Sequence, residues 1–199
     1  MKQIIDVHVT TRRAECTACK TDMLVVGRFS DGDAGEILQA LDKKLDGAIA
    51  RLARIGDFTG KPKTQAVVYG NGRIGAERVL LLGLGERKKA TLDTLRKASA
   101  TAANRAVDLR VRQVSLALHG SFLGRLDAEA VGRAIAEGVY FGAYRYDEFV
   151  TEKNNGRRAS LVAEIVDPDS KQIMGLTPGL SAGAVIGQAQ CYARTLANR

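Results

Sequence analysis

The spacing of apolar residues along the chain predicts the strands of a sheet. Residues Lys2–Thr11 alternate between apolar and polar types and are rich in β-branched side chains. The run Met23–Gly27 is continuously apolar, which is typical of a strand covered on both faces. The same reasoning predicts further strands in four later segments, Gln65–Tyr69, Arg78–Leu82, Gln113–Leu118 and Leu161–Val166.

Apolar residues at three- and four-residue steps predict helices between these strands. One amphipathic helix is expected over Gly35–Arg54, with Gly56 just past its end. Thr91 is expected to cap a second helix that runs to about Leu109, and Asp127 a third. A last helix is expected from Ser181 to the final residue.

Strands that alternate with helices predict an α/β fold, a three-layer α/β/α arrangement with a mixed sheet. The expected α/β domain covers residues 1–170, and residues 171–199 are expected to form a linker and a connecting helix. The linker is Lys171–Leu180, because Gly175, Pro178 and Gly179 interrupt helix formation. No later element would cover the apolar face of the last helix, which comprises Val185, Ile186, Tyr192 and Leu196.

Charge and cysteine content restrict the function only loosely. The formal net charge is +8, but the basic residues are spread along the chain, so a solvated surface is favoured over a DNA-binding one. Three cysteines are too few for a disulfide framework and indicate a reducing compartment, for which the cytoplasm fits best. The first residues do not form the apolar segment of a signal peptide, and no run is long enough to cross a bilayer, so we expect no membrane association.

Two glycine-rich segments are candidate nucleotide-binding loops. Gly70–Gly75 matches the pattern G-x-G-x-x-G after a strand, but a strand rather than a helix follows it, so a hairpin turn is favoured. Gly83–Gly85 lies between a strand and a helix, where backbone amides can bind an anion. It lacks the third glycine of the fingerprint, and loop geometry is the favoured explanation there too.

Other candidate motifs do not combine into a catalytic site. Cys16 and Cys19 have the C-x-x-C spacing of a zinc or redox pair, but a closed zinc site needs two more ligands, so free loop cysteines are favoured. Asp31–Asp33 and Asp167–Asp169 have the composition of turns. The two histidines, His8 and His119, lie far apart in sequence. We therefore assign no catalytic, cofactor-binding or metal-binding residue.

Several segments taken together resemble the N-terminal part of the leucyl (cytosol) aminopeptidase family. They occur in the family's order and extend over nearly the whole chain, which makes the combination more specific than any one of them. The segments are Gly56–Lys61, Arg78–Gly85, Thr91–Ala98, Ala136–Val139, Gly142–Asp147 and Ala193–Arg199.

This resemblance implies a macro-domain-like α/β domain with a linking helix, which precedes a catalytic domain expected to lie outside this chain. In the family that domain holds two divalent metals, manganese, zinc or magnesium, which activate water for the release of N-terminal amino acids. The resemblance further implies a hexameric parent in which this domain helps to join subunits, and DNA binding in some bacterial members. We expect the chain to be non-catalytic, and the alternatives are a stand-alone nucleotide or ADP-ribose module or a DNA-binding surface.

Overall fold

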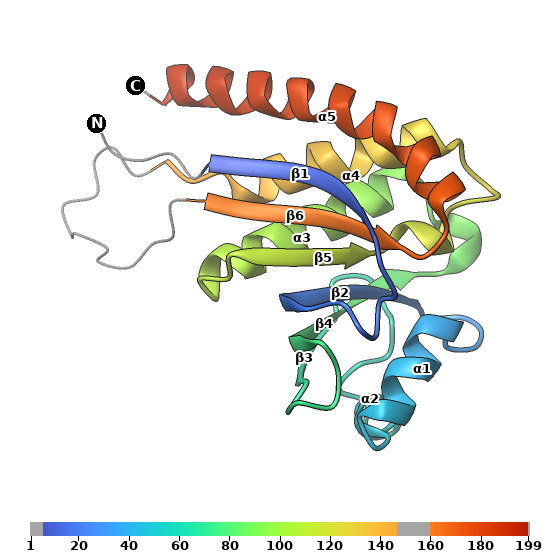
Figure 1. The fold of residues 1–199 in the computed structure, drawn as a ribbon. Coiled ribbons are helices and arrows are strands. Elements are labelled where there is room, and N and C mark those ends of the chain that lie inside the picture. Colours follow the sequence, from blue (N-terminus) through green and yellow to red (C-terminus); the bar gives the residue numbers. More distant parts are fainter. Residues whose placement is uncertain (1–5, 147–159, 199) are drawn as a thin grey trace.

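A six-stranded mixed sheet forms the centre of the protein in the computed structural model, which describes residues 6–146 and 160–198 (Figure 1). The strand order is β1-β6-β5-β2-β4-β3, and every neighbouring pair is parallel except β3 and β4. The strands are β1 (Asp6–Arg13), β2 (Thr21–Phe29), β3 (Gln65–Tyr69), β4 (Ala76–Gly85), β5 (Gln113–Ala117) and β6 (Ser160–Asp167). Every predicted strand is present, although residues 2–5 of the first lie outside the described residues.

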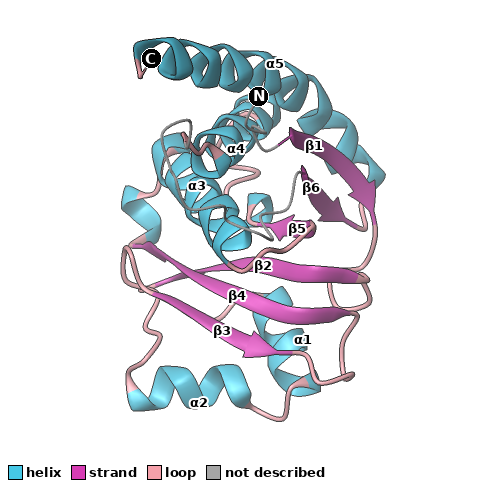
Figure 2. Ribbon diagram, turned by 90° about the vertical axis from the view of Figure 1, so that its left-hand side faces the viewer, coloured by secondary structure: helices cyan, strands magenta, loops and turns pink. Residues whose placement is uncertain are grey.

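Helices cover both faces of this sheet, which confirms the predicted α/β class (Figure 2). One face packs against α3 (Leu92–Asp108), α4 (Ala128–Ala143) and α5 (Ser170–Ala197). The other packs against α1 (Glu36–Lys44) and α2 (Ala48–Ile55), which contact strands at the β3 end of the sheet. Two short 3-10 helices, η1 (Arg87–Lys89) and η2 (His119–Ser121), follow β4 and β5.

The central strand β2 shows why its sequence is continuously apolar. Met23 and Val25 face the core under α3 and α4, whereas Leu24 and Val26 face the core under α1 and α2. All four side chains are almost completely buried. A strand covered on both faces needs apolar residues at successive positions rather than at alternate ones.

Several local predictions are confirmed by the backbone. β3 and β4 form an antiparallel hairpin around Gly70–Gly75. Thr91 caps α3 in a capping box with Thr94, and the Asp127 carboxylate accepts a hydrogen bond from the Ala130 amide at the start of α4. These side chains satisfy amides that have no partner within the first turn of a helix.

The single helix predicted over Gly35–Arg54 is wrong, because the chain breaks it into α1 and α2. Asp46 and Gly47 adopt left-handed backbone angles, with φ of 52° and 72°. The Asp42 carboxylate then accepts hydrogen bonds from the amides of Ile49 (2.8 Å) and Ala50 (3.0 Å) at the start of α2. Apolar spacing continues through the break, so the periodicity alone did not reveal it.

The predicted linker Lys171–Leu180 is also wrong, because these residues are helical and belong to α5. The Asp169 carboxylate accepts a hydrogen bond from the Lys171 amide, and the helix begins at Ser170, eleven residues earlier than expected. Pro178 lies within the helix on its exposed side. The glycines that suggested a linker instead allow close packing on α4, where a Cβ at Gly179 would lie 1.8 Å from the Glu129 carbonyl oxygen.

Candidate functional site

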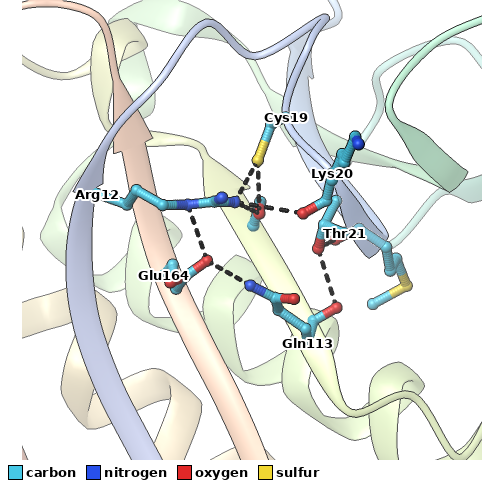
Figure 3. Close-up of polar contacts among 8 residues, drawn as sticks. Arg12, Cys19, Lys20, Thr21, Gln113 and Glu164 are labelled. Carbon is cyan, nitrogen blue, oxygen red and sulfur yellow. Dashed lines mark hydrogen bonds and ion pairs between the residues drawn. The ribbon is translucent and has the colours of Figure 1, made fainter.

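A cluster of polar side chains links three parallel strands with the turn that leads into β2 (Figure 3). Glu164 of β6 lies 3.1 Å from Nε of Arg12 on β1 and accepts a hydrogen bond from the side-chain amide of Gln113 on β5 at 2.8 Å. The Arg12 guanidinium donates to the Cys19 sulfur at 2.6 Å, and that sulfur lies 3.1 Å from the Ser115 hydroxyl. The charged and polar side chains of this cluster therefore have one another as hydrogen-bond and ion-pair partners.

The two cysteines of the C-x-x-C motif are free and buried. Burial, with smaller effects from the charges of Asp167 and Cys19, raises the pKa of the Cys16 thiol to about 11. A thiol is an effective nucleophile or metal ligand only as the thiolate, so Cys16 is poorly suited to either role at neutral pH. Within residues 6–146 and 160–198, no three His, Cys, Asp or Glu side chains are grouped in a way that could hold a metal ion.

His119 and Asp167 form a second polar contact, at the carboxyl ends of β5 and β6. The His119 Nε2 lies 2.7 Å from Asp167 Oδ2, and the histidine side chain is only 2% exposed. Burial lowers the pKa of His119 below its usual 6.5, and the hydrogen bond with Asp167 opposes part of this effect. The second histidine, His8, contacts Asp6 on the exposed face of β1, so the two histidines do not share a site.

The first and last glycine amides of both glycine-rich loops donate hydrogen bonds within the fold. In Gly70–Gly75, the Gly70 amide donates to Glu77 and the Gly75 amide to Thr17. In the second loop, Gly83 donates to Thr64 and Gly85 to Gly60. A phosphate-binding loop needs free amides that converge at the start of a helix, whereas Gly70–Gly75 is followed by β4 and the Gly83 and Gly85 amides are used within the fold.

Carboxylates of the two acidic doublets accept hydrogen bonds from backbone amides. The Asp31 carboxylate accepts a hydrogen bond from the Arg87 amide at 2.7 Å. Asp167 accepts one from the Asp169 amide at 2.7 Å, and Asp169 in turn caps α5. The turn interpretation is confirmed for Asp167–Asp169, and for Asp31–Asp33 it stays a prediction.

The most conspicuous surface feature is the apolar side of α5. Its large side chains are exposed as predicted, with exposed fractions of 68% for Val185, 66% for Tyr192 and 50% for Leu196. Beside them, a cavity of about 440 Å³ opens between α5, the end of α4 and the start of β1. Among the described helices, none combines the length and apolar character that a membrane span requires. Several large apolar side chains exposed along one helix are typical of a contact with protein.

The fold is shared with macrodomains and with aminopeptidases. The Trypanosoma brucei macrodomain solved with ADP has a TM-score of 0.58 at 15% identity, covering 85% of this chain and 67% of that one. A tomato leucine aminopeptidase mutant has a TM-score of 0.75 at 20% identity, over 96% of this chain and 37% of that one. The protein is thus a macrodomain-like α/β domain.

Sequence comparison gives the family. Residues 25–153 match the N-terminal domain of the cytosol aminopeptidase family, and the chain belongs to that family. It is 30% identical to a probable cytosol aminopeptidase of Roseiflexus castenholzii, over 96% of this chain and 37% of the relative. It is also similar to the bottromycin maturation enzyme BotP solved with Mn, at 27% identity and a TM-score of 0.62, over 90% of this chain and 32% of that one. The chain spans between about a quarter and just over a third of the length of the curated relatives it matches, for example 26% of the one from Geotalea uraniireducens and 37% of the one from R. castenholzii.

Sequence reasoning missed the two polar contacts that the fold creates. Arg12 and Glu164, like His119 and Asp167, are far apart in the chain and meet only because β6 lies between β1 and β5. No local pattern marks such pairs. The exposed apolar face of α5 was predicted, because helical spacing can be read from the sequence.

Proposed function

We propose that this chain is a non-catalytic assembly domain of a cytoplasmic metallo-aminopeptidase. Its relatives are named as probable cytosol aminopeptidases, and it matches only 36% to 37% of the length of two of them. In this proposal the residues that hydrolyse peptides lie in the part of those proteins that this chain does not match. The free thiols are consistent with a reducing cytoplasm.

The observation that carries the proposal is the unequal use of the two sides of α5. Gly179, Gly183 and Gly187 are buried against α4, while the side chains of Val185 and Tyr192 are mostly exposed, and Tyr192 lies at the cavity beside α5. The glycine side attaches the helix to the sheet domain, and the apolar side is left for a further protein surface. We assign that surface to contacts with the rest of the enzyme and with other subunits, as in the hexamer that the family resemblance implies.

The divalent metals of the proposed enzyme do not fit the acidic groups of the described residues. Glu164 is held by Arg12 and Gln113, and Asp167 is held by His119 and the Asp169 amide. A two-metal site needs several carboxylates that converge on one open position. The similar protein BotP was solved with Mn, and we place the corresponding metals outside this chain.

A hydrolysis assay tests the non-catalytic role. The purified 199-residue chain is mixed with a leucine anilide and added Mn²⁺, Zn²⁺ or Mg²⁺, and release of the aniline is followed by absorbance. The expected result is no turnover above the metal-only control. Metal-dependent turnover that is lost with a chelator would contradict the proposal.

Two other functions remain separate predictions. For ADP-ribose, the glycine-rich loops give little support, because Gly70–Gly75 is a hairpin turn and the Gly83 and Gly85 amides donate within the fold. Calorimetry with ADP-ribose should therefore show no heat of binding. If the chain binds DNA through its +8 net charge, its affinity for DNA should fall steeply as the salt concentration rises. Binding that does not respond to salt would exclude the DNA hypothesis.

A further inference from the structure

The β3 strand leaves a row of backbone hydrogen-bonding groups without partners. Among the strands that the structure describes, it is the last of the sheet, and it pairs with β4 alone. The Gly83 amide donates to Thr64 (2.9 Å) and the Gly70 amide to Glu77 (2.8 Å) at the two ends of this pair. Because hydrogen-bonded residues alternate along an antiparallel strand, the even-numbered residues of β3 face β4. The odd-numbered ones face outward.

The outward-facing residues are Gln65, Val67 and Tyr69. Within the part of the chain that the structure describes, their amides and carbonyls make no hydrogen bond to other elements. Natural edge strands are usually protected by a charge, a proline or a bulge. The segment Gln65–Tyr69 has none of these, and its register with β4 is regular.

A groove runs beside this free edge. A cavity of about 470 Å³ is lined by Leu45 and Ala48 from the α1–α2 region, by Val68 and Tyr69 of β3, and by hairpin residues that include Arg73. Both ribbon views place α2 past β3, at the end of the sheet (Figures 1 and 2). The Tyr69 side chain is 61% exposed. The edge therefore combines free backbone groups with an apolar wall.

We propose that β3 and α2 form a docking groove for an extended, acidic peptide segment of a partner protein, which adds to the sheet as a further strand. Main-chain hydrogen bonds to Val67 and its outward-facing neighbours would supply affinity, and alternate apolar side chains would enter the groove.

Charge selects this occupant over a second copy of the chain. Residues 45–73, from the groove-lining Leu45 to Arg73, contain five basic and two acidic residues, and one of the acidic residues, Asp46, is paired with Arg73. The basic residues are Arg51, Arg54, Lys61, Lys63 and Arg73. A second copy would bring the same excess of positive charge, whereas acidic residues beside a β-branched core complement it.

The first test compares two modified peptides on the unmodified protein. The probe is a short fluorescent peptide with alternating Val, Thr and Tyr residues between Asp-Glu ends, and binding is measured by fluorescence anisotropy. Two versions carry N-methyl groups on alternate amides, one on each edge of the peptide. The version methylated on the edge facing β3 should bind roughly tenfold or more weakly than the other, because it loses donors and cannot approach the strand.

Three further results decide the proposal. Hydrogen exchange at the Val67 and Tyr69 amides should slow when the unmethylated peptide binds. Lys63→Glu should weaken binding severalfold, while Lys171→Glu, on the distant α5, should not. Equal affinity of the two methylated peptides, or no binding at about 1 mM peptide, would overturn the proposal. A third contradicting result is a chain that binds no peptide but self-associates, with the association abolished by Val67→Pro. That result would identify a second copy of the chain as the occupant of the groove.

Discussion

Substitution of Gly179 by alanine tests the packing that attaches α5 to the rest of the domain. An alanine Cβ at this position would lie 1.8 Å from the Glu129 carbonyl oxygen and 2.6 Å from the Glu129 carbonyl carbon. These are backbone atoms of α4, so they cannot move aside as a flexible side chain can. The two helices must separate by about 1.6 Å to reach ordinary van der Waals contact.

The expected cost follows from two opposing effects. Overpacking of a rigid contact typically costs about 1–3 kcal/mol, and here the clash is with backbone, at the upper end of that range. Alanine is favoured over glycine within a helix by about 1 kcal/mol, which offsets part of the loss. We therefore expect Gly179→Ala to lower the free energy of unfolding by about 2 kcal/mol, with a fall in Tm of roughly 4–8 °C.

Urea unfolding followed by circular dichroism measures this change, and the same helix supplies the control. A Cβ at Gly175 would have Ala128 Cβ at 3.1 Å as its only neighbour within 4 Å. Gly175→Ala should therefore leave the free energy of unfolding unchanged or raise it by up to about 1 kcal/mol. If Gly179→Ala is as stable as Gly175→Ala, the close packing of α4 and α5 is refuted.

Two further predictions follow from the buried titratable groups. The pKa of His119 is lower in the folded state than its usual 6.5, so the unfolded chain takes up this proton first as pH falls. The contribution of His119 to the free energy of unfolding is therefore fully present above pH 6.5 and is lost as the pH falls below that value. His119→Gln should remove this part of the slope in urea titrations between about pH 7 and 5, and an unchanged slope would contradict the assignment. With a pKa of about 11, Cys16 should react with iodoacetamide at pH 8 about a hundredfold more slowly than an unperturbed thiol. Peptide mapping should show this difference disappear in urea, and rapid alkylation in the native protein would refute it.

The features that could be predicted from sequence are those with a local physical cause. The apolar run around Val25 predicted a central strand, because burial on both faces requires it. Thr91 and Asp127 predicted helix starts, because their side chains satisfy nearby amides. The turn at Gly70–Gly75 predicted a hairpin instead of a nucleotide site, because a strand follows it.

The features that escaped prediction depend on contacts between distant segments. The break before α2 is stabilised by the Asp42 carboxylate, whose role is not visible in apolar spacing. Gly179 was interpreted as a helix breaker, yet its lack of a side chain is what lets α5 approach α4. The pairing of Arg12 with Glu164 depends on the strand order, which no single segment encodes.

The exposed face of α5 gives the most direct test of the assembly role. Sedimentation equilibrium should show that the unmodified chain self-associates at concentrations up to about 100 μM, in a range typical of modest interfaces. Tyr192→Glu places a charge in the apolar face and should shift the chain to monomer, whereas Gln190→Glu adds the same charge at an exposed polar position of the helix and should not. A chain that stays monomeric throughout, or association that Tyr192→Glu leaves unchanged, would contradict the account.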